Sequence, residues 1–327
     1  MTKQPIQSAK SPTKSIITFA VISCAAAWLI ALPLWLTADP PVWLTSICAL
    51  AIMFTPTLAA VAVVVATVPK GERIRRLGLW PLGRAKRFIS SLALAFVVIV
   101  IVCLAAAPVG ALLGLQDFDI TLQPLADLTL EQLKPYGIDR LPMPVWALFL
   151  AQLFNVLIAA FVINLLPALG EEVGWRGWLL PELYQRYGTA GAILIGGALW
   201  GVWHAPLTLL GHNYGLTGLN GLLGVLLMIG FCTVIGIIFG WLRFRSNSVW
   251  PAAIAHSTLN AAAGFWFIFT PDSASHSTAL VSVVGIAGWI LPAAIAILLV
   301  ATGRFRPASA AETAPRPAVP QAAHPAP

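Results

Sequence analysis

The chain alternates between long apolar stretches and short polar connections over most of its length. A helix needs about 20 consecutive apolar residues to cross the hydrocarbon core of a bilayer. Such stretches predict eight crossings, over residues 16–37, 42–67, 88–114, 145–186, 189–210, 219–242, 248–270 and 279–302. The expected fold is therefore all-α, a polytopic membrane helix bundle with about eight transmembrane helices.

Composition supports an integral membrane protein in a lipid bilayer. Of the 327 residues 59% are hydrophobic and only 9% are charged, whereas a soluble domain is about 25% charged. The net charge of +7 would suggest nucleic acid in a soluble protein. In a membrane protein basic residues mark the cytoplasmic side instead, so no nucleic-acid partner is expected. The four cysteines lie in apolar runs without CxxC spacing and predict no disulfide framework.

The positions of the basic residues predict the orientation of the chain. On the eight-crossing arrangement 17 of the 19 Lys and Arg residues share one side with both termini. The other two, Lys134 and Arg140, lie in a loop at residues 115–143 that is rich in acidic residues. The positive-inside rule then places both termini in the cytoplasm. The first apolar run could instead be a signal peptide, but its length of about 22 residues without an A-x-A site favours an uncleaved span.

These features divide the chain into four parts. Residues 1–144 hold N-terminal transmembrane helices and the external loop, in which Leu125–Leu133 predicts a short amphipathic helix. Residues 145–270 carry most of the polar groups that lie inside apolar spans, 271–302 form the last transmembrane helix, and 303–327 form a disordered Pro/Ala-rich cytoplasmic tail. The richness in Ala, Pro and Trp suggests a bacterial plasma membrane.

The stretch from 145 to 186 is too long for one straight crossing, so a break is expected near Pro167–Gly170. After the break the pattern predicts a helix that ends in a turn at Gly188. Glu171 lies 17 residues before this turn and His204 lies 16 residues after it. Two antiparallel helices joined there would place both side chains at about the same depth in the membrane.

Two further patterns bring polar groups to the same zone. His256 and Asn260 are four residues apart, which stacks them on one face of a helix. Gly197 and Gly201 form a small-xxx-small pair that allows helices to approach closely. Ionisable groups are costly inside a membrane, so we expect them to face one another or a wet cavity.

The two adjacent glutamates are expected to play different parts. Glu172 precedes Arg176 by four residues, the favoured order for a structural ion pair on a helix. Glu171 then has no local partner, which suits a general base or a metal ligand.

The other polar residues of these spans each allow two interpretations. His204 is either a functional group or a histidine that packs on Trp200, one turn away. His256 and Asn260 could donate hydrogen bonds to a developing oxyanion, although Asn260 could equally make a structural bond between helices. No role is expected for His212, His276 or His324.

Three ordered motifs then show a resemblance to a known family. Glu171-Glu172-x-x-x-Arg176, Trp200-x-x-x-His204 and His256-x-x-x-Asn260 lie on successive membrane helices. This arrangement resembles the CPBP family, the type II CAAX prenyl endopeptidases and bacteriocin-processing or immunity membrane proteins, over residues 145–270. One residue departs from the family pattern, because Trp200 stands where the family usually has Phe.

The resemblance implies a catalytic site. It implies that Glu171 and His204 activate a water, and that His256 and Asn260 stabilise the oxyanion, with Glu172, Arg176 and Trp200 as structural support. The family is similar to both a metalloprotease and a metal-independent glutamate enzyme. If a metal such as zinc is present, Glu171, His204 and His256 would hold it; the sequence has no H-E-x-x-H motif, and we favour a metal-independent water.

The function expected from these motifs is an intramembrane CAAX-type endopeptidase that hydrolyses a peptide bond of a membrane-associated or prenyl-like substrate. Its partners would be a peptide or a membrane-anchored protein. One alternative is a proton-coupled transporter, which also places Glu and His in spans; transporters often contain repeated halves, and the sequence shows no internal repeat. The other alternative is a non-catalytic immunity or scaffold membrane protein.

Overall fold

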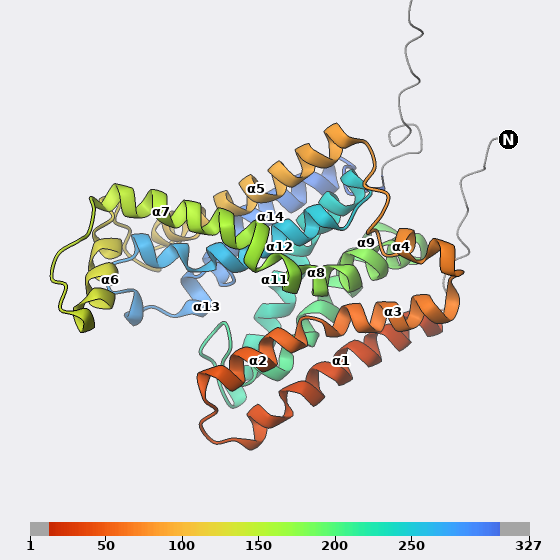
Figure 1. Ribbon diagram of the computed structural model, residues 1–327, viewed down its shortest axis with the longest axis horizontal. Coiled ribbons are helices and arrows are strands. Elements are labelled where there is room, and N and C mark those ends of the chain that lie inside the picture. Colours follow the sequence, from red (N-terminus) through yellow and green to blue (C-terminus); the bar gives the residue numbers. More distant parts are fainter. Residues whose placement is uncertain (1–12, 308–327) are drawn as a thin grey trace, which may run out of the picture.

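The computed structural model describes residues 13–307. Within this range the chain forms helices and one isolated antiparallel bridge, between Leu210 and Thr217. The prediction of an all-α polytopic bundle is confirmed (Figure 1). The tail expected at 303–327 lies outside the described residues from residue 308 onward.

The bundle has two groups of helices, with α8, α9 and α11 between them (Figure 1). The N-terminal group pairs α1 with α2 and α3, and the second group packs α5 against α12 and α14. The segments are α1 Thr13–Leu36, α2 Val42–Ile52, α3 Thr55–Thr67, α4 Arg73–Arg76, α5 Ala85–Leu112, α6 Gln123–Leu133, α7 Val145–Ile158, η3 Ala159–Ile163, α8 Leu165–Glu172, η4 Val173–Leu179, α9 Leu180–Trp203, α10 Ala205–Thr208, α11 Leu219–Ser246, α12 Trp250–Ala262, η5 Ala263–Phe269, α13 Thr278–Val281 and α14 Ile286–Ala301. The short amphipathic helix expected in the external loop is present as α6.

Seven helical stretches of the described chain are long and apolar enough to cross a membrane, against the eight that the pattern predicted. The missing stretch is 189–210. In the structure α9 has a non-helical residue at Gly188, with φ 67°. The part of α9 beyond it, 189–203, is about 22 Å long, which is shorter than the apolar core of about 30 Å. The turn predicted at Gly188 is therefore present, but the helix that follows is short.

The break predicted near Pro167–Gly170 is wrong in position. The interruption lies at Asn164, between the π-helical segment η3 and α8. Pro167 is in the first turn of α8, where a backbone N–H has no intrahelical acceptor and its loss costs little. Gly170 allows close packing instead, because a Cβ there would come 2.8 Å from the ring of Phe54. The hydroxyl of Thr57 donates to the Gly170 carbonyl at 2.6 Å and fixes α8 on α3.

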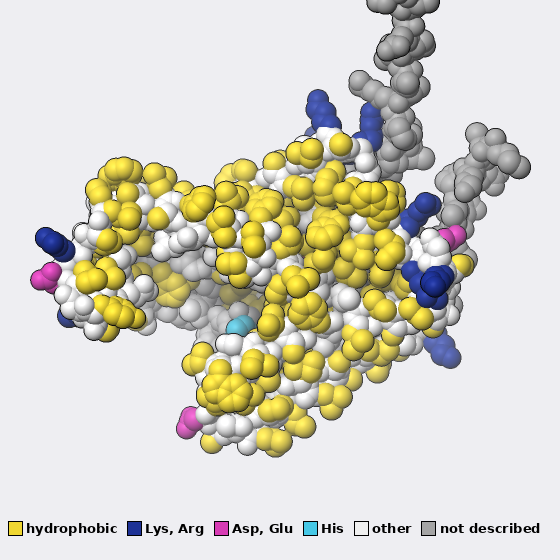
Figure 2. Space-filling model, in the orientation of Figure 1, with side chains coloured by type: hydrophobic (Ala, Val, Ile, Leu, Met, Phe, Trp, Pro, Cys, Tyr) yellow, Lys and Arg dark blue, Asp and Glu magenta, His cyan; other side chains and the backbone are white. Residues whose placement is uncertain are grey.

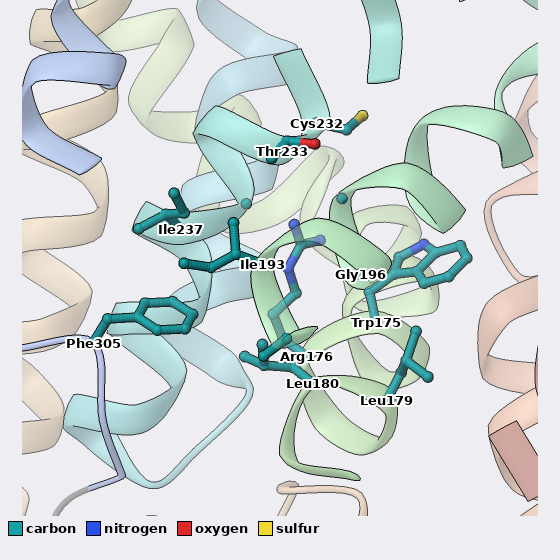
Figure 3. A pocket seen from close by; sticks show the side chains of 13 residues that line it. Trp175, Arg176, Leu179, Leu180, Ile193, Gly196, Cys232, Thr233, Ile237 and Phe305 are labelled. Carbon is teal, nitrogen blue, oxygen red and sulfur yellow. The ribbon is translucent and has the colours of Figure 1, made fainter. Parts of the chain in front are cut away.

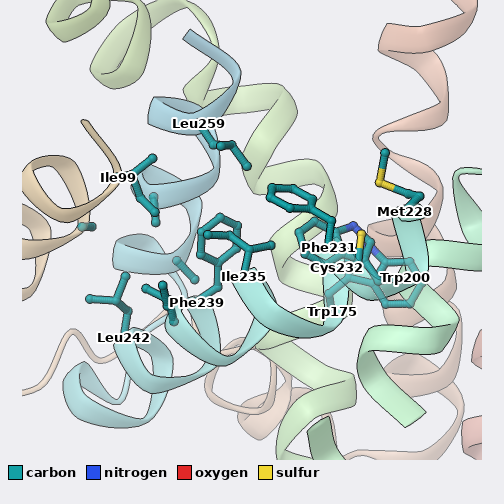
Figure 4. Close-up of a cluster of buried hydrophobic side chains, with 14 of the residues drawn as sticks. Ile99, Trp175, Trp200, Met228, Phe231, Cys232, Ile235, Phe239, Leu242 and Leu259 are labelled. Carbon is teal, nitrogen blue, oxygen red and sulfur yellow. The ribbon is translucent and has the colours of Figure 1, made fainter. Parts of the chain in front are cut away.

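The helix α11 packs against α9, α12 and η4, the segments that carry most of the motif residues. It contributes Phe231, Ile235 and Phe239 to a buried apolar cluster that also contains Trp175 and Trp200 (Figure 4). This packing is close because α9 presents glycines to α11. A Cβ at position 197 would overlap Thr233, and a Cβ at position 201 would overlap Ile229. The small-residue pair predicted from the sequence therefore serves the contact of α9 with α11.

Charge and apolar surface are separated along the long axis of the molecule. Apolar side chains cover the flanks of the bundle, as expected for a surface in contact with lipid (Figure 2). Lys and Arg side chains gather at the end where α4 lies, and the first and last described residues lie at that end too (Figures 1 and 2). At this basic end Arg76 forms an ion pair with Glu182, which joins α4 to α9. The protein is an integral membrane protein.

Candidate functional site

The polar residues of the three motifs come together inside the bundle. Glu171 at the end of α8, His204 after α9, and His256 and Asn260 on α12 all line one cavity of about 330 Å³. Trp200 lines it as well. Glu171 and His204 were predicted to lie at the same depth from their distances to the turn at Gly188, and the structure brings both to this cavity.

Glu172 lies at the centre of a buried hydrogen-bonded cluster. Its Oε1 accepts a hydrogen bond from Arg176 Nη1 at 2.8 Å, so the ion pair expected from their spacing is present. The same oxygen lies 2.9 Å from Nδ1 of His256. This second partner, on another helix, was not predicted. It ties α12 to α8 and fixes the orientation of the His256 ring.

Glu171 points away from this ion pair and towards the cavity. Its Oε2 accepts a hydrogen bond from the indole N–H of Trp200 at 2.9 Å, and its Oε1 lies 3.8 Å from Nε2 of His256. The side chain is buried. The expectation that Glu171 has no partner is therefore incomplete, because it lacks a helical partner but has a donor on α9.

Two contacts orient the remaining rings. Nδ1 of His204 lies 2.8 Å from the backbone carbonyl oxygen of Trp200, which acts as the acceptor for an Nδ1–H and leaves Nε2 as the basic nitrogen. The guanidinium carbon of Arg176 lies 3.9 Å from the centre of the Trp200 ring, a cation–π contact. Trp200 thus contacts Glu171, Arg176 and His204 together.

The local backbone helps to place the glutamates. The segment that follows Glu172 is π-helical from Val173 to Leu179, a conformation that is rare and frequent at functional sites. The side chain of Arg243 donates from Nε to the backbone carbonyl of Arg176 at 3.1 Å, within this segment. No pattern in the sequence predicted the π-helical geometry.

Several lining residues were not predicted. His212, to which no role was assigned, and Asn213 both line the cavity from the loop between α10 and α11. Trp203 and Cys232 line it too. A signal for Trp203 was available, since it directly precedes His204, but the loop residues have no periodic relation to the motifs.

The three residues considered for a metal do not form a metal site in this geometry. Among residues 13–307 no group of three or more His, Cys, Asp or Glu side chains is placed to hold a metal ion. Glu171 and His256 approach each other, but Oε2 of Glu171 is already bonded to Trp200. We therefore derive no chemical step through zinc.

Comparison with known proteins finds similar sequences for this part of the chain. Residues 152–262 match the family described as type II CAAX prenyl endopeptidase, Rce1-like. The resemblance to the CPBP proteases is confirmed. A CAAX prenyl protease 2 from Methanococcus maripaludis is 33% identical over 105 residues, which cover 29% of this chain and 36% of that protein. All seven site and support residues lie within the matched residues 152–262, whereas α1–α6 and α14 lie outside them.

Proposed function

We propose that this protein is an intramembrane endopeptidase that hydrolyses a peptide bond of a membrane-associated peptide or protein with an activated water. The observation that carries the proposal is the meeting of Glu171, His204, His256 and Asn260 in one cavity within an apolar bundle. The match to CAAX-type proteases over the same residues supports it.

In the proposed reaction Glu171 acts as the general base. It takes a proton from a water in the cavity while the water oxygen attacks the scissile carbonyl carbon. The Nε2 lone pair of His204 positions this water. When the C–N bond breaks, the proton held by Glu171 passes to the leaving amine, so that the carboxylate is regenerated and one water is consumed for each bond cleaved.

The developing oxyanion would be stabilised from α12. The amide of Asn260 donates one hydrogen bond, and Nε2–H of His256 donates a second. The charges of the neighbouring buried side chains suit this role, because the two carboxylates of Glu171 and Glu172 face one guanidinium, that of Arg176. A protonated His256, with Nδ1–H on Glu172, brings the net charge of these four side chains to zero.

Cells that produce the wild-type protein are compared with cells that produce Glu171→Gln at the same level. The measurement is the set of peptide fragments recovered from their membranes by mass spectrometry. Fragments present only with the wild type support an endopeptidase, and the purified protein should regenerate them from the uncut substrate. Identical sets of fragments from both strains would contradict the proposed function.

Asn260→Ala is expected to lower the hydrolysis rate by about 100-fold, the usual scale for loss of one oxyanion donor. The exposed side chain of Asn260 makes no hydrogen bond within the described residues, so folding should be retained. Asn213→Ala is the matched control, because it removes an amide that lines the same cavity from the loop before α11 and should leave the rate nearly unchanged. Equal losses in both variants would count against an oxyanion role.

Trp200→Phe is expected to lower the hydrolysis rate about tenfold, because it keeps an aromatic ring but removes the donor to Glu171. A hydrogen bond to a charged group is worth about 1.5–3 kcal/mol, and about 1.4 kcal/mol corresponds to a factor of ten. Trp203→Phe is the control, since its indole donates to Thr55 at the same 2.9 Å and not to a glutamate. The measurement is the cleavage rate of both purified variants, normalised to folded protein. A wild-type rate for Trp200→Phe would show that the hydrogen bond from Trp200 to Glu171 does not contribute to hydrolysis.

A strong chelator is expected to leave the hydrolysis rate unchanged, because the donor set of Glu171, His204 and His256 does not form a metal site in this geometry. The measurement is the cleavage rate of the purified enzyme before and after chelation. Loss of activity that added zinc restores would show that the three side chains rearrange around a metal ion.

A further inference from the structure

Two spaces of very different size lie near the site. The cavity that holds Glu171 and His204 measures about 330 Å³. A second space, which Arg176 lines together with Leu180 and Phe305, measures only about 20 Å³ (Figure 3). This is room for about one water molecule.

The side towards the basic end is closed by buried charged and aromatic groups. Arg176 is held by Glu172 and lies under the ring of Trp200. Arg243, itself buried, donates to the backbone of Arg176 from behind, and Phe239 packs within 5.2 Å of the same guanidinium. Opening this side would separate a buried ion pair and leave its charges without partners.

The opposite side of the cavity is open. Its lining includes His212 and Asn213 of the loop before α11, and Ala263 at the start of η5. The side chains of His212 and Asn260 are exposed, whereas those of Glu171 and Trp200 are buried. A hollow that contains a histidine side chain lies between the α6–α7 end and the α1–α2 end of the molecule (Figure 2).

The direction of this opening follows from the helices that line it. The helix α12 begins at Trp250, close to Arg243 and Arg245 at the end of α11, and runs away from them. Ala263 is therefore about 20 Å further along the axis, at 1.5 Å per residue. The mouth faces the end that carries Lys134 and Arg140 with the acidic residues of the 115–143 loop, and the main basic cluster lies at the other end.

We propose that the catalytic cavity opens to the non-cytoplasmic face of the membrane, and that the substrate is a peptide segment presented from that face. The first part rests on the geometry above together with the positive-inside rule. That a substrate enters this cavity rests on the proposed function. A CAAX terminus in the cytoplasm would not reach Glu171 by this route.

The lining also indicates the chemistry of that segment. Glu171 is the one acidic residue of the cavity wall, and no Lys, Arg or Asp lines it. The wall is otherwise mainly apolar and aromatic, with Met53, Trp203, Leu207, Met228, Phe231 and Leu259. Such a site accepts neutral, apolar side chains around the scissile bond, as found in a peptide that lies at a membrane surface.

The opening can be tested by cysteine labelling of the full-length protein in intact cells. The four native cysteines are replaced by alanine, and one cysteine is added at Ala263→Cys or Asn213→Cys in the mouth. Lys134→Cys marks the loop at 115–143 and Lys86→Cys marks the basic end. The probe is a membrane-impermeant sulfonated maleimide, applied before and after permeabilisation, and labelling is read as a mass shift.

We expect Ala263→Cys, Asn213→Cys and Lys134→Cys to be labelled in intact cells, and Lys86→Cys to be labelled only after permeabilisation. Labelling of both mouth positions only after permeabilisation, together with Lys86→Cys, would overturn the proposal. Labelling of Lys86→Cys but not Lys134→Cys in intact cells would also overturn it, since the whole orientation would be inverted. Asn213→Cys, in a loop, serves if Ala263→Cys fails to fold.

This experiment measures access and needs no hydrolysis. Labelling as expected without any fragments would support the outward-facing cavity and contradict the proposed peptidase function. Fragments together with labelling from the cytoplasm would support the peptidase function and contradict the outward-facing cavity.

Discussion

Glu171→Gln is expected to lower the rate of peptide hydrolysis by about 100-fold or more, the scale of general-base assistance. Glutamine keeps the size of the side chain and can still accept the indole hydrogen bond of Trp200 through its amide oxygen. Folding should therefore be retained, while the group that takes the proton from water is lost. The measurement is the cleavage rate of a membrane peptide by the purified variant, normalised to folded protein.

Glu172→Gln is the matched control for this substitution, because the two residues are adjacent and both buried. It leaves Arg176 without its charged partner and weakens the bond to His256, so its first effect should be on stability. A fully active Glu171→Gln enzyme would remove Glu171 from the mechanism. An equal loss in both variants at equal folded yield would show that the pair acts as one unit.

Arg176→Ala is expected to destabilise the protein by about 3–5 kcal/mol, the cost of leaving a buried charge without its partner. Arg176 also contacts the face of Trp200, and this contact is lost with the guanidinium. The measurement is the free energy of unfolding in detergent, with folded yield from membranes as a second readout.

The double variant Arg176→Ala with Glu172→Ala should recover part of this stability, because no unpaired carboxylate remains. It should not recover activity, because His256 then loses the acceptor that orients its ring. A double variant that is less stable than Arg176→Ala would show that the ion pair is not what holds these charges in the bundle. A double variant with wild-type activity would remove the His256–Glu172 bond from the mechanism.

Features that depend on neighbouring residues were predicted well. The Glu172–Arg176 ion pair follows from a spacing of four residues on a helix, and the turn at Gly188 follows from a residue that tolerates positive φ. The α6 helix follows from a local amphipathic pattern. Each of these depends on a few residues that are close in the chain, which a sequence displays directly.

The break in the fourth apolar stretch shows where local reasoning fails. Pro167 and Gly170 are typical helix breakers, yet the interruption lies at Asn164. Pro167 is harmless in a first helical turn, and Gly170 is needed for contact with Phe54 and Thr57, which lie more than 100 residues earlier in the chain. From sequence alone, a proline or glycine that breaks a helix therefore could not be distinguished from one that packing requires.

The order of residues along the chain was enough to predict a helical membrane bundle with separated charges, and to place the motif glutamates and histidines within the apolar zone. Which groups these side chains contact depends on how the helices pack, and the fold was needed to show it. Trp200 bonds to Glu171 across 29 positions of sequence, and His256 bonds to Glu172 across 84. His212, which no pattern singled out, reaches the cavity from a loop. Buried polar groups must find partners wherever the packed helices supply them, and the identity of those partners depends on helix rotation and depth, which hydrophobic periodicity does not specify.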